Sequence, residues 1–401
     1  MSIEKQLQDI EQYVIELRRW FHMHPELSLK EEKTSAKIKE ELDKIGIPYE
    51  AGFINSFHPN EKEYSIIATI EGTLVSDKKL GIRADFDALP VSEDTGLSFC
   101  STHEGVMHAC GHDAHAAMLL GAGKIIWENK DKLAGTVKLL FQAAEEIGGG
   151  SGVNSIINEL EKTGGLDNVI GIHIWSAIPA GQILLKDETI FAGTGSIKYL
   201  ITGKGGHGAR PDLVHDPIKA ACDMVTNLSR IPSNFYNVLD NSVVAICHFE
   251  SGSLGNIFPD TAKIRGGYRY FNPGGHIDIR RAIHKVAAAT AIMHDVKIEV
   301  IEDAEKEVLA PIYNTPELIA PARELVSNID GLELCAQKTP ISASDNFGKI
   351  LDKYKGFYAI LGAGKPNEEI YPQHNPKFDI DETVLIKGSE FMVKYALNYF
   401  N

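Results

Sequence analysis

The sequence predicts an α/β protein in which a larger α/β domain is interrupted by a smaller inserted domain. The chain has 401 residues, more than the roughly 250 to 300 at which a single core usually stops growing, so two domains are expected. From about residue 65 short apolar runs alternate with helical stretches, a pattern typical of a largely parallel sheet. From about residue 196 this pattern changes, and it returns before the C-terminus.

The larger domain is expected to begin with an amphipathic helix. Its apolar residues recur on one helical face; they are Leu7, Ile10, Val14, Leu17 and Phe21. Because this segment lacks the apolar core of a signal peptide, we assign it to the fold. The segments that read as strands are 64–70, 79–87, 135–146, 168–175 and 356–364. Helices are predicted over 113–129 and 382–400, and ligands of such sheets gather where the strands end.

The inserted domain is expected to alternate strands and helices in a different order. Strands are predicted over 196–203, 242–250, 263–271 and 296–302, and helices over 216–231 and 276–294. The order β-α-β-β-α-β is that of a ferredoxin-like unit. We therefore expect residues 191–305 to form an inserted ferredoxin-like domain, and residues 1–190 and 306–401 to form the larger domain.

Composition excludes several classes of protein. The net charge is −15, and the acidic residues are spread along the chain, which argues against a nucleic-acid partner. No apolar run approaches the roughly 18 residues of a membrane span, so no membrane association and a cytoplasmic location are expected. The five cysteines are odd in number and include no CxxC pair, so they do not form a disulfide framework.

Metal-ligand residue types follow several of the predicted strands. The stretch MHACGHDAH at 107–115 places Cys110 two residues before His112 at a strand-to-helix junction. Taken alone, the pair is equally compatible with a buried thiol beside helix histidines. Further candidates follow other strands or lie in loops; they are the adjacent Glu145 and Glu146, His173, and His374 in YPQHNP.

One thiolate, three imidazoles and a carboxylate make a plausible ligand set for two divalent metals that share the sulfur. The other glutamate of the adjacent pair would then act as a base on water. Asp85 or Asp87, at the end of another predicted strand, could hold a ligand histidine in orientation. His115, one helical turn after His112, is a further candidate ligand, although its helix face is expected to pack on the sheet.

Seven ordered motifs between about residues 15 and 385 resemble the M20 metallopeptidase clan. The match is to its aminoacylase-like amidohydrolase branch, which includes hippurate hydrolases, auxin-conjugate (IAA-amino acid) hydrolases and N-acetyldiaminopimelate deacetylases. The motifs are FHMHPELS, GIRADFDALPV, MHACGHDAH, QAAEE, GIHIW, GKGGHGARP and HNPKFDIDE. The resemblance implies a two-metal catalytic domain interrupted by a lid domain.

The resemblance also implies roles for individual residues of the catalytic domain. The family's metal ligands fall on Cys110, His112, Glu146, His173 and His374, with Cys110 in the bridging place. Its general base falls on Glu145, and the aspartate that orients a ligand falls on Asp87. The implied cofactor is two divalent metal ions per subunit, zinc or manganese, with cobalt or nickel as further options.

Three residues of the inserted domain match lid positions of the family. His207 corresponds to the lid histidine that points at the substrate carbonyl. Asn256 and Arg269 correspond to lid residues that hold a substrate carboxylate. The family also implies a homodimer formed through the lid domain, by an exposed sheet edge or helix face.

The chain departs from the family pattern at a few positions. Ala143 stands where relatives usually have proline. Asp345 and Asn346 stand where relatives often have Glu-Asp, which puts local contacts near the substrate in doubt. Asp85 stands where the broader clan has a histidine ligand, so the cysteine branch takes its ligands from the C-x-H pair instead.

The leading functional hypothesis is a metal-dependent amidohydrolase that acts on small N-acyl amino acids. Glu145 would move a proton from water to the leaving amine, and His207 would stabilise the oxyanion. A dipeptidase or carboxypeptidase of the same clan is the closer alternative. A non-catalytic binding protein on the same scaffold is the other, although a pure binder has no need of a base.

Overall fold

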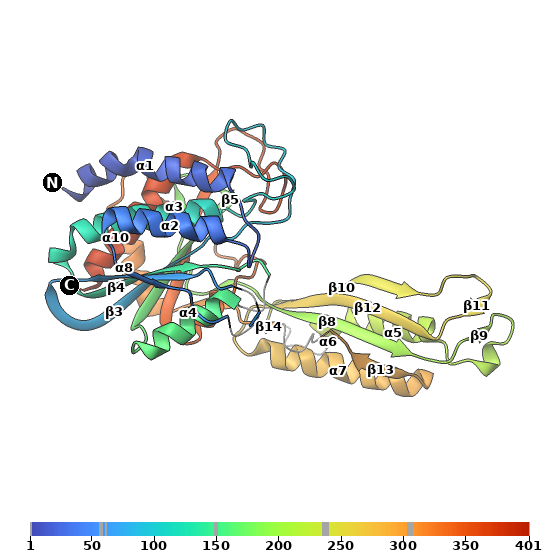
Figure 1. The fold of residues 1–401 in the computed structure, drawn as a ribbon. Coiled ribbons are helices and arrows are strands. Elements are labelled where there is room, and N and C mark those ends of the chain that lie inside the picture. Colours follow the sequence, from blue (N-terminus) through green and yellow to red (C-terminus); the bar gives the residue numbers. More distant parts are fainter. Residues whose placement is uncertain are drawn as a thin grey trace. The chain divides into compact units, whose positions relative to one another are not determined.

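The computed structural model describes residues 2–55, 59–60, 62–147, 151–234, 240–302 and 308–400. The chain forms two compact units. The first comprises residues 1–188, 313–339 and 346–401, and the second comprises residues 189–312 and 340–345. Figure 1 labels their helices and strands. Each unit has its own cluster of buried apolar side chains, so each has its own core.

The first unit is built around an eight-stranded sheet with the order β1-β2-β4-β3-β5-β17-β6-β16. Its strands are β1 (Tyr49–Ala51), β2 (Ile66–Glu71), β3 (Leu74–Asp85), β4 (Ala134–Gln142), β5 (Asn168–Pro179), β6 (Gln182–Leu184), β16 (Glu333–Leu334) and β17 (Lys355–Gly364). The central strands β4, β3, β5 and β17 are parallel to one another. In contrast, β2 is antiparallel to β4, and β6 is antiparallel to β17.

The sheet is therefore mixed, which corrects the expectation of a largely parallel one. Only two residues separate β2 from β3, and only two separate β5 from β6. Such short connections reverse the chain, since a parallel strand needs a crossover of about a dozen residues or more. In each case another strand, β4 or β17, lies between the two connected strands in the sheet. Gly181, in the second of these turns, has φ +83°, a left-handed conformation that glycine adopts without strain.

Helices cover both faces of this sheet (Figure 1). On one face α1 (Ile3–Met23), α3 (His112–Glu128) and α10 (Leu385–Tyr399) pack against one another, and α4 (Ser151–Lys162) lies on the other. A Cβ on Gly121 of α3 would lie 2.6 Å from Val14 of α1, so this close approach requires glycine. The remaining helices are α2 (Glu32–Ile45), α8 (Pro316–Val326) and α9 (Gly348–Leu351), with 3-10 turns η1 (Lys130–Lys132) and η3 (Glu382–Val384).

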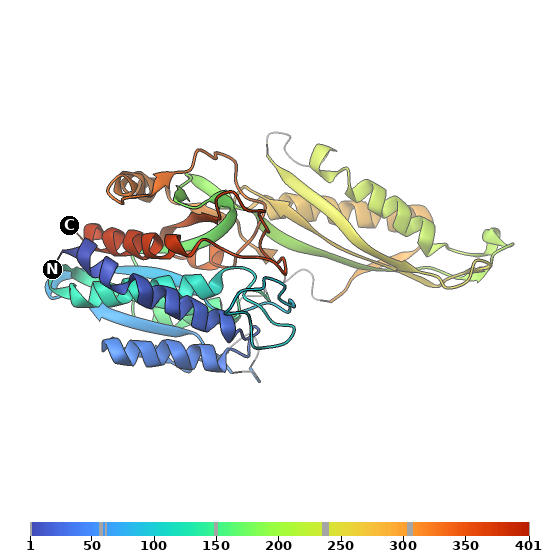
Figure 2. The ribbon, with the colours of Figure 1, turned by 90° about the horizontal axis from the view of Figure 1, so that it is seen from above.

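Both ends of the chain lie in the first unit, where α1 and α10 are neighbours (Figure 2). The helix α3 is buried along nearly its whole length, and it begins at the carboxyl ends of the central parallel strands. The residues with candidate chemistry are on the loops at this end.

The second unit contains a five-stranded antiparallel sheet, in which four strands have the order β10-β12-β8-β13. Its strands are β8 (Gly193–Thr202), β10 (Ser242–Ser251), β12 (Thr261–Tyr270) and β13 (Lys297–Val300), and β14 (Val308–Leu309) adds to β8. The helix α5 (Pro217–Leu228) lies between β8 and β10 in the chain, and α7 (Gly275–His294) lies between β12 and β13. The smaller elements are β9 (Gly206–His207), β11 (Ile257–Phe258), η2 (Pro211–Leu213) and α6 (Ile231–Asn234).

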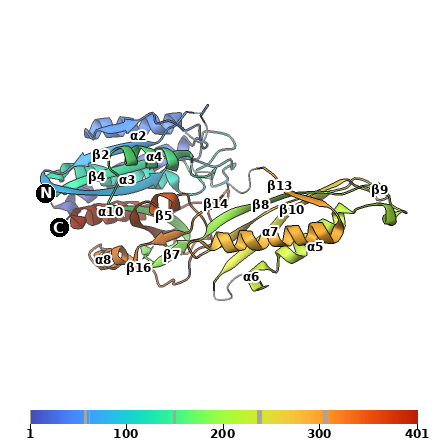
Figure 3. The ribbon, with the colours of Figure 1, turned by 90° about the horizontal axis from the view of Figure 1, so that it is seen from below.

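Both long helices of the second unit pack on one face of its sheet (Figure 3). Burial alternates along β8, so that Ile197, Tyr199 and Ile201 face the helices. In the part of the chain that the structure describes, no helix combines the length and hydropathy needed to cross a membrane.

Candidate metal centre

The C-x-H pair lies at the start of α3, where the backbone makes a sharp turn. Gly111, between Cys110 and His112, has φ +89°, and a Cβ there would lie 3.3 Å from the Cβ of Ile174. Glycine is thus required both by the left-handed conformation and by the close approach of β5. The turn brings Cys110 and His112 to the same side, and both are buried.

Hydrogen bonds fix the tautomers of two of the candidate ligand histidines. His112 Nδ1 donates to the carbonyl oxygen of Asp87 at 3.0 Å, with Asp87 Oδ1 at 3.3 Å. His173 Nδ1 donates to the carbonyl oxygen of Ile174 at 2.6 Å. Because carbonyl oxygens only accept, Nδ1 carries the proton in each ring. The neutral form of each ring therefore has an unprotonated Nε2, which is the form that binds metals. His173 Nε2 lies 3.7 Å from the sulfur of Cys110.

The fourth and fifth candidate ligands approach from two loops. The Glu146 N–H donates to Asp87 Oδ2 at 2.9 Å. The His374 N–H donates to the carbonyl oxygen of Ala109 at 2.7 Å, which ties its loop to the C-x-H turn. His374 has φ +67°, and its Nε2 lies 3.6 Å from Glu146 Oε1.

These side chains form two groups of donor atoms that share one sulfur. The ligand atoms of Cys110, His112 and His173 lie within 4.8 Å of one another, and so do those of Cys110, Glu146 and His374. Sulfur, imidazole and carboxylate donors at such spacing suit divalent metal ions such as zinc. The structure thus brings together all five residues that the sequence proposed as ligands.

The electrostatics of the pair Glu146 and Cys110 also fit a cation. Burial raises the pKa of Glu146 to about 7, against the opposing charge of His112 and with further increases from Asp87 and Asp85. Burial likewise raises the pKa of the Cys110 thiol well above its usual value, and the charge of Glu146 adds to this. Glu146 Oε1 is buried and has no hydrogen-bond partner among the described residues. A cation beside these groups would stabilise their ionised forms.

A third cluster, of Asp85, His112 and His115, is explained without a metal. His115 Nδ1 donates to Asp85 Oδ1 at 2.5 Å, and its Nε2 accepts the N–H of Ile174 at 2.9 Å. Both nitrogens of His115 are therefore used in holding β3 and β5 to α3. Asp85 also pairs with Arg83 at 2.7 Å. The expectation that the His115 face packs on the sheet agrees with these contacts.

The other member of the adjacent glutamate pair, Glu145, is held by Asn346. The Asn346 N–H donates to Glu145 Oε1 at 3.0 Å, and its side-chain amide donates to the Glu145 carbonyl oxygen at 3.3 Å. Gln142 in turn donates to Asn346 Oδ1 at 2.7 Å. Glu145 has a carboxylate oxygen within 4.8 Å of donor atoms of His112 and Glu146. At this distance its carboxylate can accept a proton from a water molecule beside the candidate ligands.

Sequence reasoning treated Asn346 only as a departure from the family pattern. Its position two hundred residues after Glu145 gives no local signal of contact. Gln142 was not singled out either, although it directly precedes the AAEE stretch.

Three candidate residues belong to the second unit. His207 in β9 pairs with Ile257 in β11, and its ring Nδ1 accepts the N–H of Ala209 at 3.0 Å. Asn256 lies beside it, since its carbonyl oxygen accepts the N–H of Gly208 at 2.8 Å. Both side chains are exposed. Arg269 lies near the other end of β12, where it donates to the hydroxyl of Thr194.

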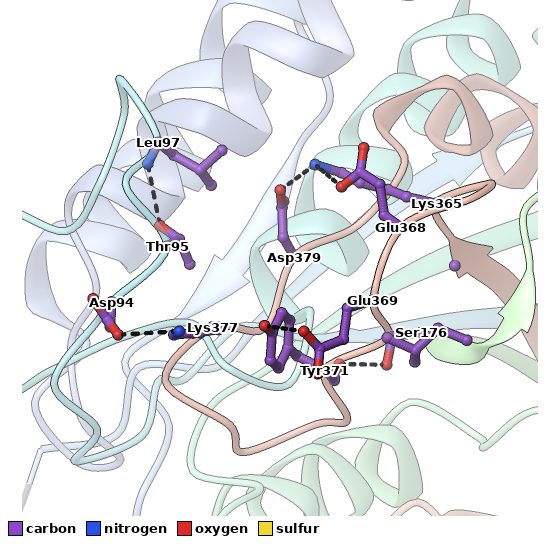
Figure 4. A pocket seen from close by; sticks show the side chains of 12 residues that line it. Asp94, Thr95, Leu97, Ser176, Lys365, Glu368, Glu369, Tyr371, Lys377 and Asp379 are labelled. Carbon is purple, nitrogen blue, oxygen red and sulfur yellow. Dashed lines mark hydrogen bonds and ion pairs between the residues drawn. The ribbon is translucent and has the colours of Figure 1, made fainter.

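A cavity of about 370 Å³ opens beside the loop that carries His374 (Figure 4). Its charged side chains are largely paired with one another: Lys377 lies 3.8 Å from Asp94, and Lys365 contacts Asp379. None of the candidate ligands is among its lining residues. In one wall the Ser176 hydroxyl donates to the Tyr371 carbonyl oxygen at 2.9 Å. The polar groups that line the cavity therefore help to hold the loop that carries His374.

Comparisons with known proteins extend over nearly the whole chain. A family model described as peptidase family M20/M25/M40 matches residues 81–398. Thermostable carboxypeptidase 1 of Saccharolobus solfataricus is 32% identical over 401 residues, covering 100% of this chain and 98% of that protein. N-acetyl-L-cysteine deacetylase of Bacillus subtilis is 33% identical over 390 residues, covering 97% of this chain and 89% of that protein.

A solved structure gives the same picture of the fold. The YXEP protein of Bacillus subtilis, described as a dinuclear metal-binding peptidase from the M20 family, matches with a TM-score of 0.81 at 26% identity. The match covers 98% of this chain and 99% of that one.

Proposed function

The chain belongs to peptidase family M20/M25/M40, and from this premise we propose that it is a two-metal amidohydrolase of N-acyl amino acids. It would cleave the amide bond of an N-acetyl, N-benzoyl or other N-acyl amino acid, including those with an aryl acyl group, to a carboxylate and a free amino acid. The observation that carries the proposal is the pair of donor groups that share Cys110, with Glu145 beside them. A relative that covers nearly the whole chain is named a deacetylase of an N-acetyl amino acid, which supports this substrate class.

The proposed cofactor is two divalent cations per subunit. Cys110, His112 and His173 would hold one, and Cys110, Glu146 and His374 would hold the other. Zinc or manganese suits these donors, and cobalt or nickel can also bind them. Bound there, such ions polarise an amide carbonyl and make water a stronger acid. The description of the YXEP protein as dinuclear supports the count of two.

Glu145 is the proposed general base. Its carboxylate would accept a proton from the attacking water and pass it to the nitrogen of the departing amine. The N–H of Asn346 fixes one carboxylate oxygen at 3.0 Å, so the acceptor is positioned before substrate arrives. Asp87 would act through His112, by holding the tautomer whose Nε2 is unprotonated.

The second unit is the proposed lid, and residues 191–305 within it are the proposed ferredoxin-like domain. Its strand order and its two helices on one face support this assignment. From it His207 would donate a hydrogen bond to the oxyanion that develops on the substrate carbonyl. Asn256 and Arg269 would hold the carboxylate of the substrate.

The positions of these three residues within the second unit support a homodimer. His207 and Asn256 lie together at β9 and β11, whereas Arg269 pairs with Thr194, where the chain enters β8. The eight residue-to-residue steps from Thr261, at the start of β12, to Arg269 span about 26 Å. One small substrate cannot touch both ends of such a strand, so one copy would supply His207 and Asn256 and the other would supply Arg269.

Two surfaces of the second unit could form the dimer contact. Strand β10 is at the edge of the sheet, and its Val243 and Phe249 are exposed. Exposed Ile292 and Met293 lie near the end of α7. Apolar side chains on an open strand edge or helix face are typical of surfaces that pair with another copy.

A carboxypeptidase is the second candidate, because a relative aligned over the full chain carries that name. Both activities would use the same base and the same cations, and they differ in what the pocket accepts. The two activities are separated by measuring how fast the metal-reconstituted protein hydrolyses N-acetyl amino acids, N-benzoyl amino acids and dipeptides. Hydrolysis of dipeptides in preference to N-acyl amino acids would move the assignment to the carboxypeptidase.

A further inference from the structure

The glutamate pair is carried by a turn whose backbone is strained. Ala144, directly before Glu145, has φ +54°, and a left-handed conformation costs a residue with a Cβ about 1 kcal/mol or more. Ala144 is fully buried, so its N–H must find a partner inside the protein. Something in the surrounding fold therefore has to hold this turn.

That partner is the carboxyl group of Glu31. The Ala144 N–H donates to Glu31 Oε1 at 2.8 Å. Glu31 comes from the residue before α2 and gives α2 no side-chain cap, so its carboxyl group does not serve its own helix. Glu31 is 0% exposed. Burial of a carboxyl group costs free energy unless hydrogen bonds compensate for the lost contact with water.

A second buried carboxylate holds the other side of the same turn. Asp87 Oδ2 accepts the N–H of Glu146 at 2.9 Å and the hydroxyl of Ser28 at 2.6 Å. Besides the bonds from Asn346 to Glu145, the turn thus has two buried carboxyl supports: Asp87 at Glu146, and Glu31 at the residue before Glu145. Loss of the Glu31 bond would leave the Glu146 N–H in place and free the backbone that leads into Glu145.

The environment of Glu31 is consistent with a neutral acceptor. Burial raises its pKa well above the usual value, the charge of Asp87 raises it further, and backbone N–H groups of Glu31, Ala144 and Leu29 oppose the shift. Its Oε2 is buried and has no hydrogen-bond partner among the described residues. A neutral side chain with one carbonyl-type oxygen facing Ala144 can also accept the hydrogen bond from the Ala144 N–H.

We propose that Glu31 is a positioning residue for Glu145, acting by accepting the N–H of Ala144 and so holding the left-handed turn that aims the base. This inference rests on the proposed role of Glu145. It predicts that the shape and acceptor of residue 31 matter for turnover, that its charge does not, and that the bound cations remain when it is altered.

Three substitutions of the full-length, metal-loaded protein test the proposal. Glu31→Gln keeps an acceptor oxygen at the same reach and should keep kcat near that of the unaltered protein. Glu31→Asp retracts the acceptor by one methylene, and Glu31→Leu keeps the volume without any acceptor. Both should lower kcat by about 10- to 100-fold with little change in KM, because small misplacements of a catalytic group carry costs of that order. Metal analysis should still find two ions per chain.

Glu41→Leu is the matched control. Glu41 is another buried carboxylate of α2, and it accepts the hydroxyl of Tyr13 at 2.9 Å far along the helix from Ala144. Its loss should lower the melting temperature without changing kcat. Amide hydrogen exchange at Ala144 adds a readout that does not depend on turnover: protection should fall in the Asp and Leu variants and remain in the Gln variant.

The outcomes separate this proposal from the proposed function. Unchanged kcat in both the Asp and Leu variants would overturn it, and so would a Gln variant as slow as the Leu variant, since charge would then be what matters. If the Leu variant fails to fold, the Asp and Gln variants still decide. Normal turnover by Glu145→Gln would instead refute the base assignment itself, whatever the Glu31 variants show.

Discussion

The two units of the molecule hold their candidate catalytic side chains in opposite ways. In the first unit Cys110, His112 and His173 are buried, and the two histidine rings are fixed by bonds to backbone carbonyls. In the second unit His207 is exposed, and its ring Nδ1 accepts from Ala209 only two residues away. The first unit organises its centre by its own fold. The second unit leaves His207 accessible to a substrate or to another protein surface.

The same contrast extends to the charges. Arg18 and Asp113 in the first unit form an ion pair with both side chains 0% exposed, whereas Arg265 and Glu302 in the second unit are 38% and 43% exposed. Surface pairs contribute little to stability, and buried pairs are strongly destabilising when one partner is lost. Acid and mutation should therefore affect the first unit more than the second.

The largest expected effect is that of Glu145→Gln in the first unit. The amide keeps the shape and cannot accept a proton, so kcat should fall by about 10²- to 10⁴-fold while two metals remain bound. Steady-state kinetics and metal analysis on the same preparation check this. Turnover near the unaltered rate would remove Glu145 as the base.

The corresponding change in the second unit is His207→Ala. Loss of one oxyanion donor should lower kcat by roughly 10²-fold or more, and the protein should fold normally because this side chain is exposed. An unchanged kcat would refute the role of His207.

Mixing the two variants shows which chain supplies His207. If the histidine acts on the other subunit, dimers formed from Glu145→Gln and His207→Ala chains should regain one working site. If it acts within its own chain, the mixture should stay as slow as its parents. In that case His207 would reach the substrate through a conformational change within its own chain.

Thiol labelling compares the units within one sample. Cys110 should resist alkylation in metal-loaded protein, because a coordinated thiolate is masked as a nucleophile. After chelation it should react at alkaline pH, because burial raises the pKa of the free thiol. Cys222 and Cys247 of the second unit are exposed and should label equally with and without metal, which makes them internal controls. Mass spectrometry of the labelled peptides measures all three. Equal labelling of Cys110 in both states would show that it is not a ligand.

The smallest effect concerns acid. Burial acts to raise the pKa of Glu93, but bonds from His22, the Ser101 N–H and Thr95 lower it to about 2 from the usual 4.5. Because the pKa is lower in the folded state, the stabilisation is present above about pH 4.5 and is lost as the pH falls toward 2. Glu93→Gln should therefore lose less stability between pH 5 and pH 3 than the unaltered protein.

Tryptophan fluorescence reports on this unit alone, since Trp20, Trp127 and Trp175 all belong to it. Denaturant unfolding followed by this signal at each pH gives the comparison. Identical pH slopes for the two proteins would contradict the assigned shift.

Local patterns in the sequence predicted most of the strands and the five residues that meet around Cys110. Glu146 and His173 lie in or just after apolar runs, so parallel strands bring them to one edge of the sheet. His374 lies in a proline-flanked loop, which the HNPKFDIDE motif identified. The antiparallel strand β6 was missed, since no strand was predicted between residues 175 and 196 and three residues are too few to show a periodic pattern. Asn346 and Glu31 were missed because their contacts with Glu145 and Ala144 join segments more than a hundred residues apart. Such supports depend on tertiary packing, which periodicity does not report.

The connection between the units has a consequence for protein engineering. The chain leaves the first unit after Glu188 and returns at Tyr313, and residues 340–345 are a second, short excursion. The side-chain amide of Asn314 donates to the carbonyl oxygen of Lys186 at 2.8 Å, so departure and return are neighbours. A short linker in place of the intervening segment could join them without rethreading the large sheet. Such a truncated chain would retain Cys110, His112, Glu146, His173 and His374, and would allow ion capture to be studied apart from turnover.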